Sequence, residues 1–340
     1  MRRQLPALLL FLLAPVIGEY LLGNLPLGSA DALAVYLPLV FLYGAGAVII
    51  RECTVRAGRG WPTLLLLALA YGVVEEGIIT QSLFNPAYVG LELNAYGVIP
   101  GTQTGAPWAL YVLTLHSVWS IVVPIVLVEV LFPGRRRQPW LPWPMLIPAG
   151  IVYLLGAALF GFGTYVQEDF LAGPGRLAVA AGIAVTLVLA AFLLPRRRTP
   201  NDATTRPGTP WRATVLGGIA FAAGSAFFLL FILGVSERML PPYVHVAATL
   251  AVIIGFAVVV RINTARPGWS DAHLFALAAG GVLTYCWGGV VVQSSQYDYG
   301  PLTATVQFTL IAAAVTLLVH IGRRTRKPST PRSPSTTPTR

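Results

Sequence analysis

Charged residues are scarce in this chain. Of its 340 residues, 11% are charged and 56% are hydrophobic. A water-soluble protein of this length needs far more charge to cover its surface. The composition therefore excludes a soluble globular protein and indicates an integral membrane protein.

Cysteine is scarce too, and the usual metal-binding clusters are missing. The chain has two cysteines: Cys53 falls in a predicted cytoplasmic loop and Cys286 deep in a predicted span, so a disulfide between them is implausible. No CxxC motif or His/Cys cluster suggests a metal site. No motif indicates a phosphate, nucleotide or sugar ligand. We therefore expect no metal and no cofactor.

Long apolar runs make up most of the chain. Ten of them have about the 20 apolar residues that a spanning helix requires. They are 5–22, 32–50, 62–83, 108–132, 145–166, 176–194, 213–235, 242–260, 271–292 and 302–321. The sequence thus predicts an all-α, polytopic membrane helix bundle. Residues 1–321 would form a single transmembrane domain, followed by a disordered cytoplasmic tail at 322–340.

Basic residues are distributed unevenly along this pattern. If the N-terminus is cytoplasmic and the spans alternate, 21 of the 23 Lys and Arg residues fall in cytoplasmic segments, and only Arg176 and Arg238 fall outside. This bias predicts cytoplasmic termini in a multi-pass protein of the plasma membrane. The net charge of +10 then reflects topology and contact of Arg-rich loops with anionic inner-leaflet lipid, so no nucleic-acid partner is expected.

A weak internal repeat relates two parts of the chain. Ala47–Arg51 is followed by Trp61, and the similar run Ala257–Arg261 is followed by Trp269. These matches favour two parallel four-helix units joined by two linking helices, as in many transporters. The units would occupy 1–133 and 211–321, with the linking helices at 145–195. The alternative is that apolar helices ending in arginine resemble one another by chance.

The most informative feature is a pair of adjacent glutamates, Glu75 and Glu76, inside an apolar span. One ionisable group in hydrocarbon costs at least ~2.5–3.5 kcal/mol on insertion scales, so the pair indicates a site or a neutralising partner. At 1.5 Å per residue, both glutamates lie in the outer half of the bilayer. His116, on the next antiparallel span, lies at a similar depth. We therefore expect His116 to contact one of them.

Helical geometry separates the two glutamates. Successive helix residues point about 100° apart, so Glu75 and Glu76 are not expected to face the same neighbour. Glu76 shares a face with Gly72 and Thr80, and we expect it to be the inner partner of His116. The candidate proton-exchanging or catalytic residues are therefore Glu75, Glu76 and His116.

Further polar residues in the outer half extend this candidate site. They are Glu19, Tyr71, Thr80, Gln81, Ser120 and His245. Glu19 alone is interpreted rather as a snorkelling residue near the interface. At the cytoplasmic end, Glu129 is expected to pair with the arginines at 135–137.

The segment around the glutamates resembles the first motif of the CAAX-protease and bacteriocin-processing membrane family. The resemblance rests on Glu75-Glu76, on Leu83-Phe84 at the family's spacing, and on His116, which matches a later family histidine. Thr80 stands where the family carries an arginine. The resemblance implies a glutamate and a histidine that activate water for peptide hydrolysis within the membrane.

Three functions remain open from the sequence. The first is a proton- or cation-linked transporter of an unknown small molecule, with its site beneath the outer loop 84–107. The second is a membrane-embedded hydrolase of an unknown peptide substrate, with Glu75 or Glu76 as general base. The third is a structural membrane subunit in which a buried polar contact ties helices together.

Overall fold

The fold is a bundle of long helices. The computed structural model describes residues 3–25, 30–194, 207–296 and 300–325, and the regular structure within these ranges is entirely helical. Nine helices there are long and apolar enough to cross a membrane, and the remaining predicted span is the shorter helix Leu5–Leu21. The prediction of a polytopic all-α membrane bundle is therefore confirmed.

The observed helices follow the predicted spans, and several contain π-helical turns. Proline in the first turn of α4, α5 and α8 fits a helix start, because its missing N–H would be unpaired there anyway. The elements are α1 (Leu5–Pro15) with η1 (Val16–Leu21); α2 (Ala30–Leu39), η2 (Val40–Gly44) and α3 (Ala45–Arg56); α4 (Trp61–Val74) with η3 (Glu75–Ile79); α5 (Ala106–Leu115), η6 (His116–Val122) and α6 (Val123–Leu131); α7 (Leu146–Glu168); α8 (Pro174–Leu193); α9 (Ala213–Phe231) with η10 (Ile232–Ser236); α10 (Pro242–Thr264); α11 (Asp271–Gln296); and α12 (Pro301–Thr325).

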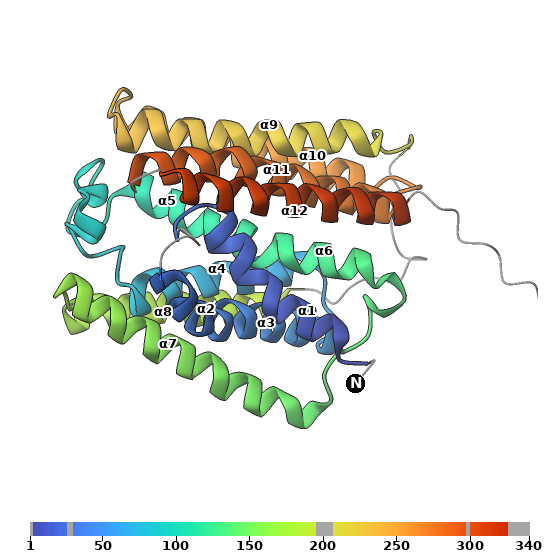
Figure 1. The fold of residues 1–340 in the computed structure, drawn as a ribbon, viewed down its shortest axis with the longest axis horizontal. Helices are drawn as coiled ribbons and strands as arrows, with labels where there is room; N and C mark the ends of the chain where they lie inside the picture. Colours follow the sequence, from blue (N-terminus) through green and yellow to red (C-terminus); the bar gives the residue numbers. More distant parts are fainter. Residues whose placement is uncertain (1–2, 26–29, 195–206, 297–299, 326–340) are drawn as a thin grey trace, which may run out of the picture.

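Burial separates the central helices from the peripheral ones. In the span Ala106–Leu131, 78% of the apolar window is buried, whereas in Trp143–Glu168 only 6% is buried. The span that carries the two glutamates is also central, with 67% of its window buried. Figure 1 shows α9–α12 as a layer above the N-terminal helices, with α7 at the opposite edge. Large apolar side chains are exposed on α7, α8, α10 and α12, and these faces are available to lipid.

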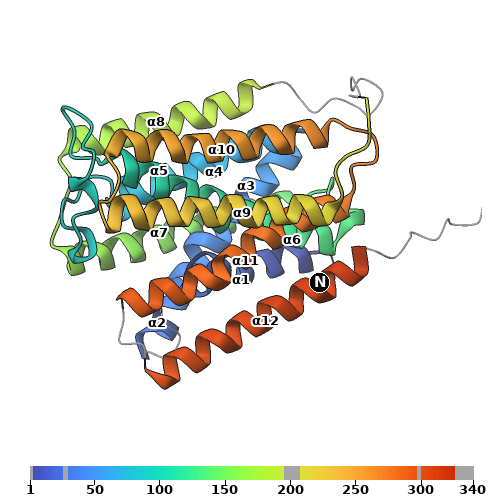
Figure 2. The same ribbon diagram turned by 90° about the horizontal axis from the view of Figure 1, so that it is seen from above.

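The connections gather at the two ends of the bundle. The loop 84–107, which is predicted to face outward and is called the outer loop below, lies at one end, and α1 begins at the other (Figures 1 and 2). Span three ends at Ile79 rather than at residue 83, because Gln81 adopts a left-handed conformation (φ 57°) and the chain turns away. The Asn94 side chain then fastens the loop by donating to the carbonyls of Ser82 (2.7 Å) and Asn85 (2.9 Å).

The last helix is longer than predicted. It continues through Thr325, so the first four residues of the predicted tail are helical. The rest of that tail, 326–340, lies outside the described residues.

Candidate functional site

Glu75, Glu76 and His116 meet in the centre of the bundle. Nε2 of His116 lies 2.7 Å from Oε1 of Glu76, and Nδ1 of the same ring lies 3.1 Å from Oε2 of Glu75. All three residues are buried, with 1–5% of each exposed. The contact predicted from their matched depth is therefore confirmed.

Both glutamates face the same histidine, and in this respect the prediction from ideal helix geometry is wrong. The reason is a π-helical turn at Glu75–Ile79, in which the Thr80 N–H donates to the Glu75 carbonyl five residues back (2.8 Å). A π turn widens the helix and changes the angle between successive side chains. Moreover, the imidazole presents nitrogens on two edges, so one ring accommodates two carboxylates.

The second oxygen of Glu76 is held by hydroxyl groups. Thr80 Oγ1 donates to Oε2 at 3.1 Å, and the Ser82 hydroxyl donates to the same oxygen. Thr80 was expected in the site from its position one turn after Glu76. Ser82 was missed, because it lies beyond the helix end and reaches back only through the turn at Gln81.

A second group of polar residues approaches the other side of the His116 ring. Nδ1 of His116 lies 3.3 Å from the Ser120 hydroxyl and 3.5 Å from the Tyr43 hydroxyl. Tyr43 donates to Oε1 of Glu19 at 2.6 Å, and Asn24 donates to Oε2 at 3.1 Å. Glu19 is 7% exposed, so its interpretation as a snorkelling residue is wrong. Tyr43 connects it to the histidine.

Three other candidates have different surroundings. The Tyr71 ring packs near the rings of Tyr43 and Tyr153 (centroids 6.0 and 6.2 Å away). Gln81 accepts a hydrogen bond from the Ala172 N–H at 2.6 Å, so it fastens the α7–α8 connection. His245 packs against the Tyr96 ring and directly against Gly234, where an added Cβ would lie 1.7 Å from Nδ1.

π-helical segments supply the ionisable residues of this cluster. Glu19 lies in η1, Tyr43 in η2, the two glutamates in η3 and His116 in η6. Single π turns inside α-helices are rare and occur frequently at functional sites. Four of them converging on one cluster indicate that the bundle is shaped around these polar groups. We refer to Glu19, Tyr43, Glu75, Glu76 and His116 as the central cluster.

The charges of the central cluster do not balance within the described residues. The cluster holds three buried carboxylates and one imidazole: Glu75 and Glu76 pair with His116, and Glu19 is linked to it through Tyr43. Buried negative charge without compensation is costly, so the arrangement favours uptake of protons or of another cation. One ligand atom each from Glu75, Glu76 and His116 lies within 4.8 Å of the others, a spread that a divalent cation can bridge.

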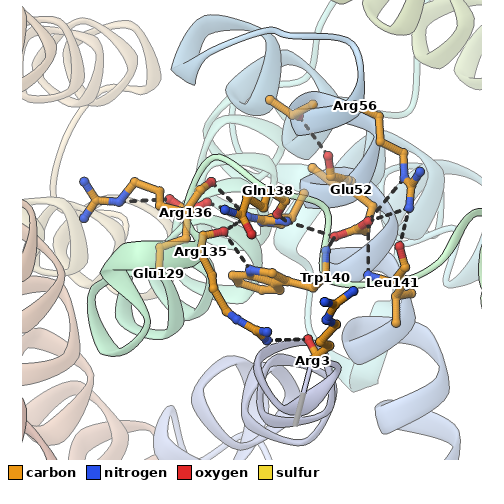
Figure 3. A network of polar contacts seen from close by, with 12 residues as sticks. Arg3, Glu52, Arg56, Glu129, Arg135, Arg136, Gln138, Trp140 and Leu141 are labelled. Carbon is orange, nitrogen blue, oxygen red and sulfur yellow. Dashed lines mark hydrogen bonds and ion pairs between the residues drawn. The ribbon is translucent and has the colours of Figure 1, made fainter. Parts of the chain in front are cut away.

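The end of the bundle where α1 begins holds a network of charged residues that the sequence pattern predicts only in part (Figure 3). Arg51 is fully buried, pairs with Glu52 (2.9 Å) and Glu129 (3.4 Å), and lies 3.7 Å from the centre of the Trp140 ring. The expected pairing of Glu129 with the 135–137 arginines is confirmed by Arg136 at 3.7 Å. The signal in the sequence is the adjacent pair Arg51-Glu52, which directly follows the predicted span 32–50. Hydropathy ends that span at residue 50, so it predicts a solvated Arg51 in a cytoplasmic loop, whereas both side chains are fully buried.

This fold and its buried ionisable cluster define a multi-pass integral membrane protein. A family model described as "Uncharacterized membrane protein family" matches residues 8–330, and the chain therefore belongs to that family. No curated protein and no solved structure gives a significant match. The matching model is not that of the CAAX-protease and bacteriocin-processing family, so that resemblance stays a hypothesis.

Proposed function

We propose that this protein is a proton- or cation-linked transporter of a small molecule, with the central cluster as its cation site. The observation that carries the proposal is the excess of buried carboxylates over cationic side chains around His116. A purely structural tie between helices needs one hydrogen-bonded pair. Three buried carboxylates in a cluster with one histidine are more than a tie requires, and each one is a position at which a cation can bind and leave.

Enclosure of the cluster supports the same function. Glu75, Glu76 and His116 are each at most 5% exposed, and the outer-loop residues around Asn94 close the bundle beyond Ser82. A group buried from both ends exchanges with solvent only when helices move. Alternating access requires such an occluded state between the states open to either side.

The proposal is tested by reconstituting the full chain into liposomes that contain a pH-sensitive dye. A panel of amino acids, organic acids and organic cations is added outside, and the internal pH and the uptake of each compound are followed. The expected result is a compound whose uptake moves protons, or depends on an external cation, in proportion to the protein present. If no compound causes flux above that of protein-free liposomes, the transporter proposal falls.

A membrane-embedded hydrolase is the second candidate, and one observation favours it. Both oxygens of Glu75 lack a hydrogen bond of good geometry, although Nδ1 of His116 lies 3.1 Å away. A buried carboxylate with free lone pairs beside an imidazole can position and deprotonate a water molecule. The discriminating measurement is incubation of the same proteoliposomes with hydrophobic peptides: cleavage without flux supports the hydrolase.

A further inference from the structure

A separate cavity of about 210 Å³ lies where α4 begins and α10 ends. Its lining combines apolar and aromatic side chains with a few polar ones, and it comes from α3, α4 and the α10–α11 region, together with Glu129 and Arg136. Among the lining residues are Thr54, Arg59, Trp61, Arg136, Thr264 and Trp269. Trp61 and Trp269 are the two tryptophans that occupy matching positions in the proposed repeat.

Arg59 has unused hydrogen-bonding capacity within this cavity. Its Nη2 donates to the carbonyl of Phe192 in the last turn of α8. Its Nε and Nη1 are buried and have no hydrogen-bond partner among the described residues. Buried donors are rarely left unpaired in folded proteins, and a guanidinium edge with free N–H groups matches the oxygens of a carboxylate or phosphate.

Three arginines close to the cavity are neutralised by acids. Arg51, Arg56 and Arg136 pair with Glu52, Glu129 and Asp271. Glu129, which also lines the cavity, is paired with both Arg51 and Arg136. These three cations and three anions balance, and Arg59 forms no ion pair among the described residues. The cavity therefore keeps about one positive charge for a ligand.

The first turn of α4 adds to this charge. Gly60 and Trp61, at the start of this 14-residue helix, line the cavity beside Arg59. The N-terminus of a helix carries partial positive charge and favours an anion. Drug-sized ligands occupy pockets of roughly 300–1,000 Å³, so this smaller cavity suits a compact anionic group.

We propose that this cavity binds a phosphate group, held by Arg59 and the start of α4 and flanked by the indoles of Trp61 and Trp269. At the end of the bundle that holds the basic loops, phosphate is supplied either by an anionic lipid head group or by a soluble phosphate compound. The site is distinct from the central cluster and does not depend on the transporter proposal.

The test uses the full chain and two phosphate probes. Inorganic phosphate is titrated into protein in a neutral maltoside detergent, and phosphatidylglycerol is compared with phosphatidylcholine in nanodiscs. Binding is measured by thermal shift, and lipid retention by native mass spectrometry. Arg59→Gln should weaken binding about tenfold or more, because a charged hydrogen bond is lost. Arg59→Lys should weaken binding less, because lysine keeps the positive charge and loses only the paired N–H donors of the guanidinium.

Arg261→Gln is the matched control, since it removes an exposed arginine from the same end outside the cavity. It should change binding less than twofold. Trp269→Phe gives an independent readout: it should remove part of any fluorescence change that phosphate causes. Binding of the soluble probe identifies free phosphate, and binding of phosphatidylglycerol alone identifies a lipid head group. Absence of both, or binding that Arg59→Gln and Trp269→Phe leave unchanged, overturns the proposal.

Discussion

Nε2 of His116 and Oε1 of Glu76 lie 2.7 Å apart, on neighbouring antiparallel spans. The opposite ring nitrogen faces Glu75, so one imidazole stands between two carboxylates. An imidazolium donates from both nitrogens, whereas a neutral imidazole donates from one. An imidazolium can therefore donate to both glutamates, whereas a neutral ring donates to only one of them, according to its tautomer.

Glu76→Gln should preserve the fold and abolish coupled flux. Glutamine keeps the size of Glu76 but carries no exchangeable charge, and Glu75 stays beside His116 as its counter-charge, so the substitution should cost little stability. In a transporter, pH-dependent or cation-dependent uptake in proteoliposomes should be lost. In a hydrolase, substrate should still bind while turnover falls by ~10²–10⁴-fold.

Glu92→Gln is the matched control for this variant. Glu92 lies in the outer loop with 72% of its side chain exposed, paired with Arg238, and its replacement should leave both activities within twofold. If Glu76→Gln, Glu75→Gln and His116→Ala all retain full flux and full turnover, both functional hypotheses fall. The structural-subunit alternative would then stand.

Tyr43→Phe should disconnect Glu19 from the rest of the central cluster. The change leaves Oε1 of Glu19 buried without its 2.6 Å donor, which costs about 1–3 kcal/mol of unfolding free energy. Tyr36→Phe is the control, because the Tyr36 hydroxyl donates to the Leu12 carbonyl at an exposed position. Thermal unfolding in detergent compares the two. Equal losses of unfolding free energy in both variants would show that the buried Tyr43–Glu19 hydrogen bond stabilises the protein no more than the exposed Tyr36 contact does.

Hydropathy predicts the spans, and the depth of each residue in its span predicts the contact between His116 and the glutamates. Apolar length fixes where spans run, and antiparallel neighbours at equal depth bring His116 to the glutamates. Two features depend on information outside those rules. The π turn that directs Glu75 toward His116 is a local departure from α-helical geometry, and the 3.6-residue period of an α-helix cannot predict it. The burial of Arg51 depends on Trp140, 89 residues further along the chain, and no local pattern encodes that contact.

The orientation of the chain is predicted from its basic residues and stays to be measured. Reporter fusions after Arg137, after Arg212 and at the C-terminus should all read cytoplasmic, and a fusion within 84–107 should read external. The bundle places the start of α1 and the outer loop at opposite ends, as this topology requires (Figure 1). A single external signal at 196–212 would contradict the ten-span topology.

Arg51→Met should be the most destabilising of these variants. Arg51 and Glu52 are both fully buried, and Arg51 also donates to the carbonyls of Gln138 (2.8 Å) and Arg136 (2.9 Å). Removing the cation leaves Glu52 with Arg56 as its remaining ion partner and takes a donor from two carbonyl groups, at a cost of about 3–5 kcal/mol. Arg238→Gln, which breaks only the exposed pair with Glu92, should cost about 0–1 kcal/mol.

A double variant separates the ion pair from the packing of Arg51. If the loss in Arg51→Met comes from the weaker compensation of the Glu52 charge, adding Glu52→Gln should recover part of it, so that the double loss is smaller than the sum of the single losses. Unfolding of all four proteins is followed in the same detergent. Strict additivity would assign the stabilising role of Arg51 to its stacking on Trp140 and its bonds to the α6–α7 connection, because those contacts do not involve Glu52.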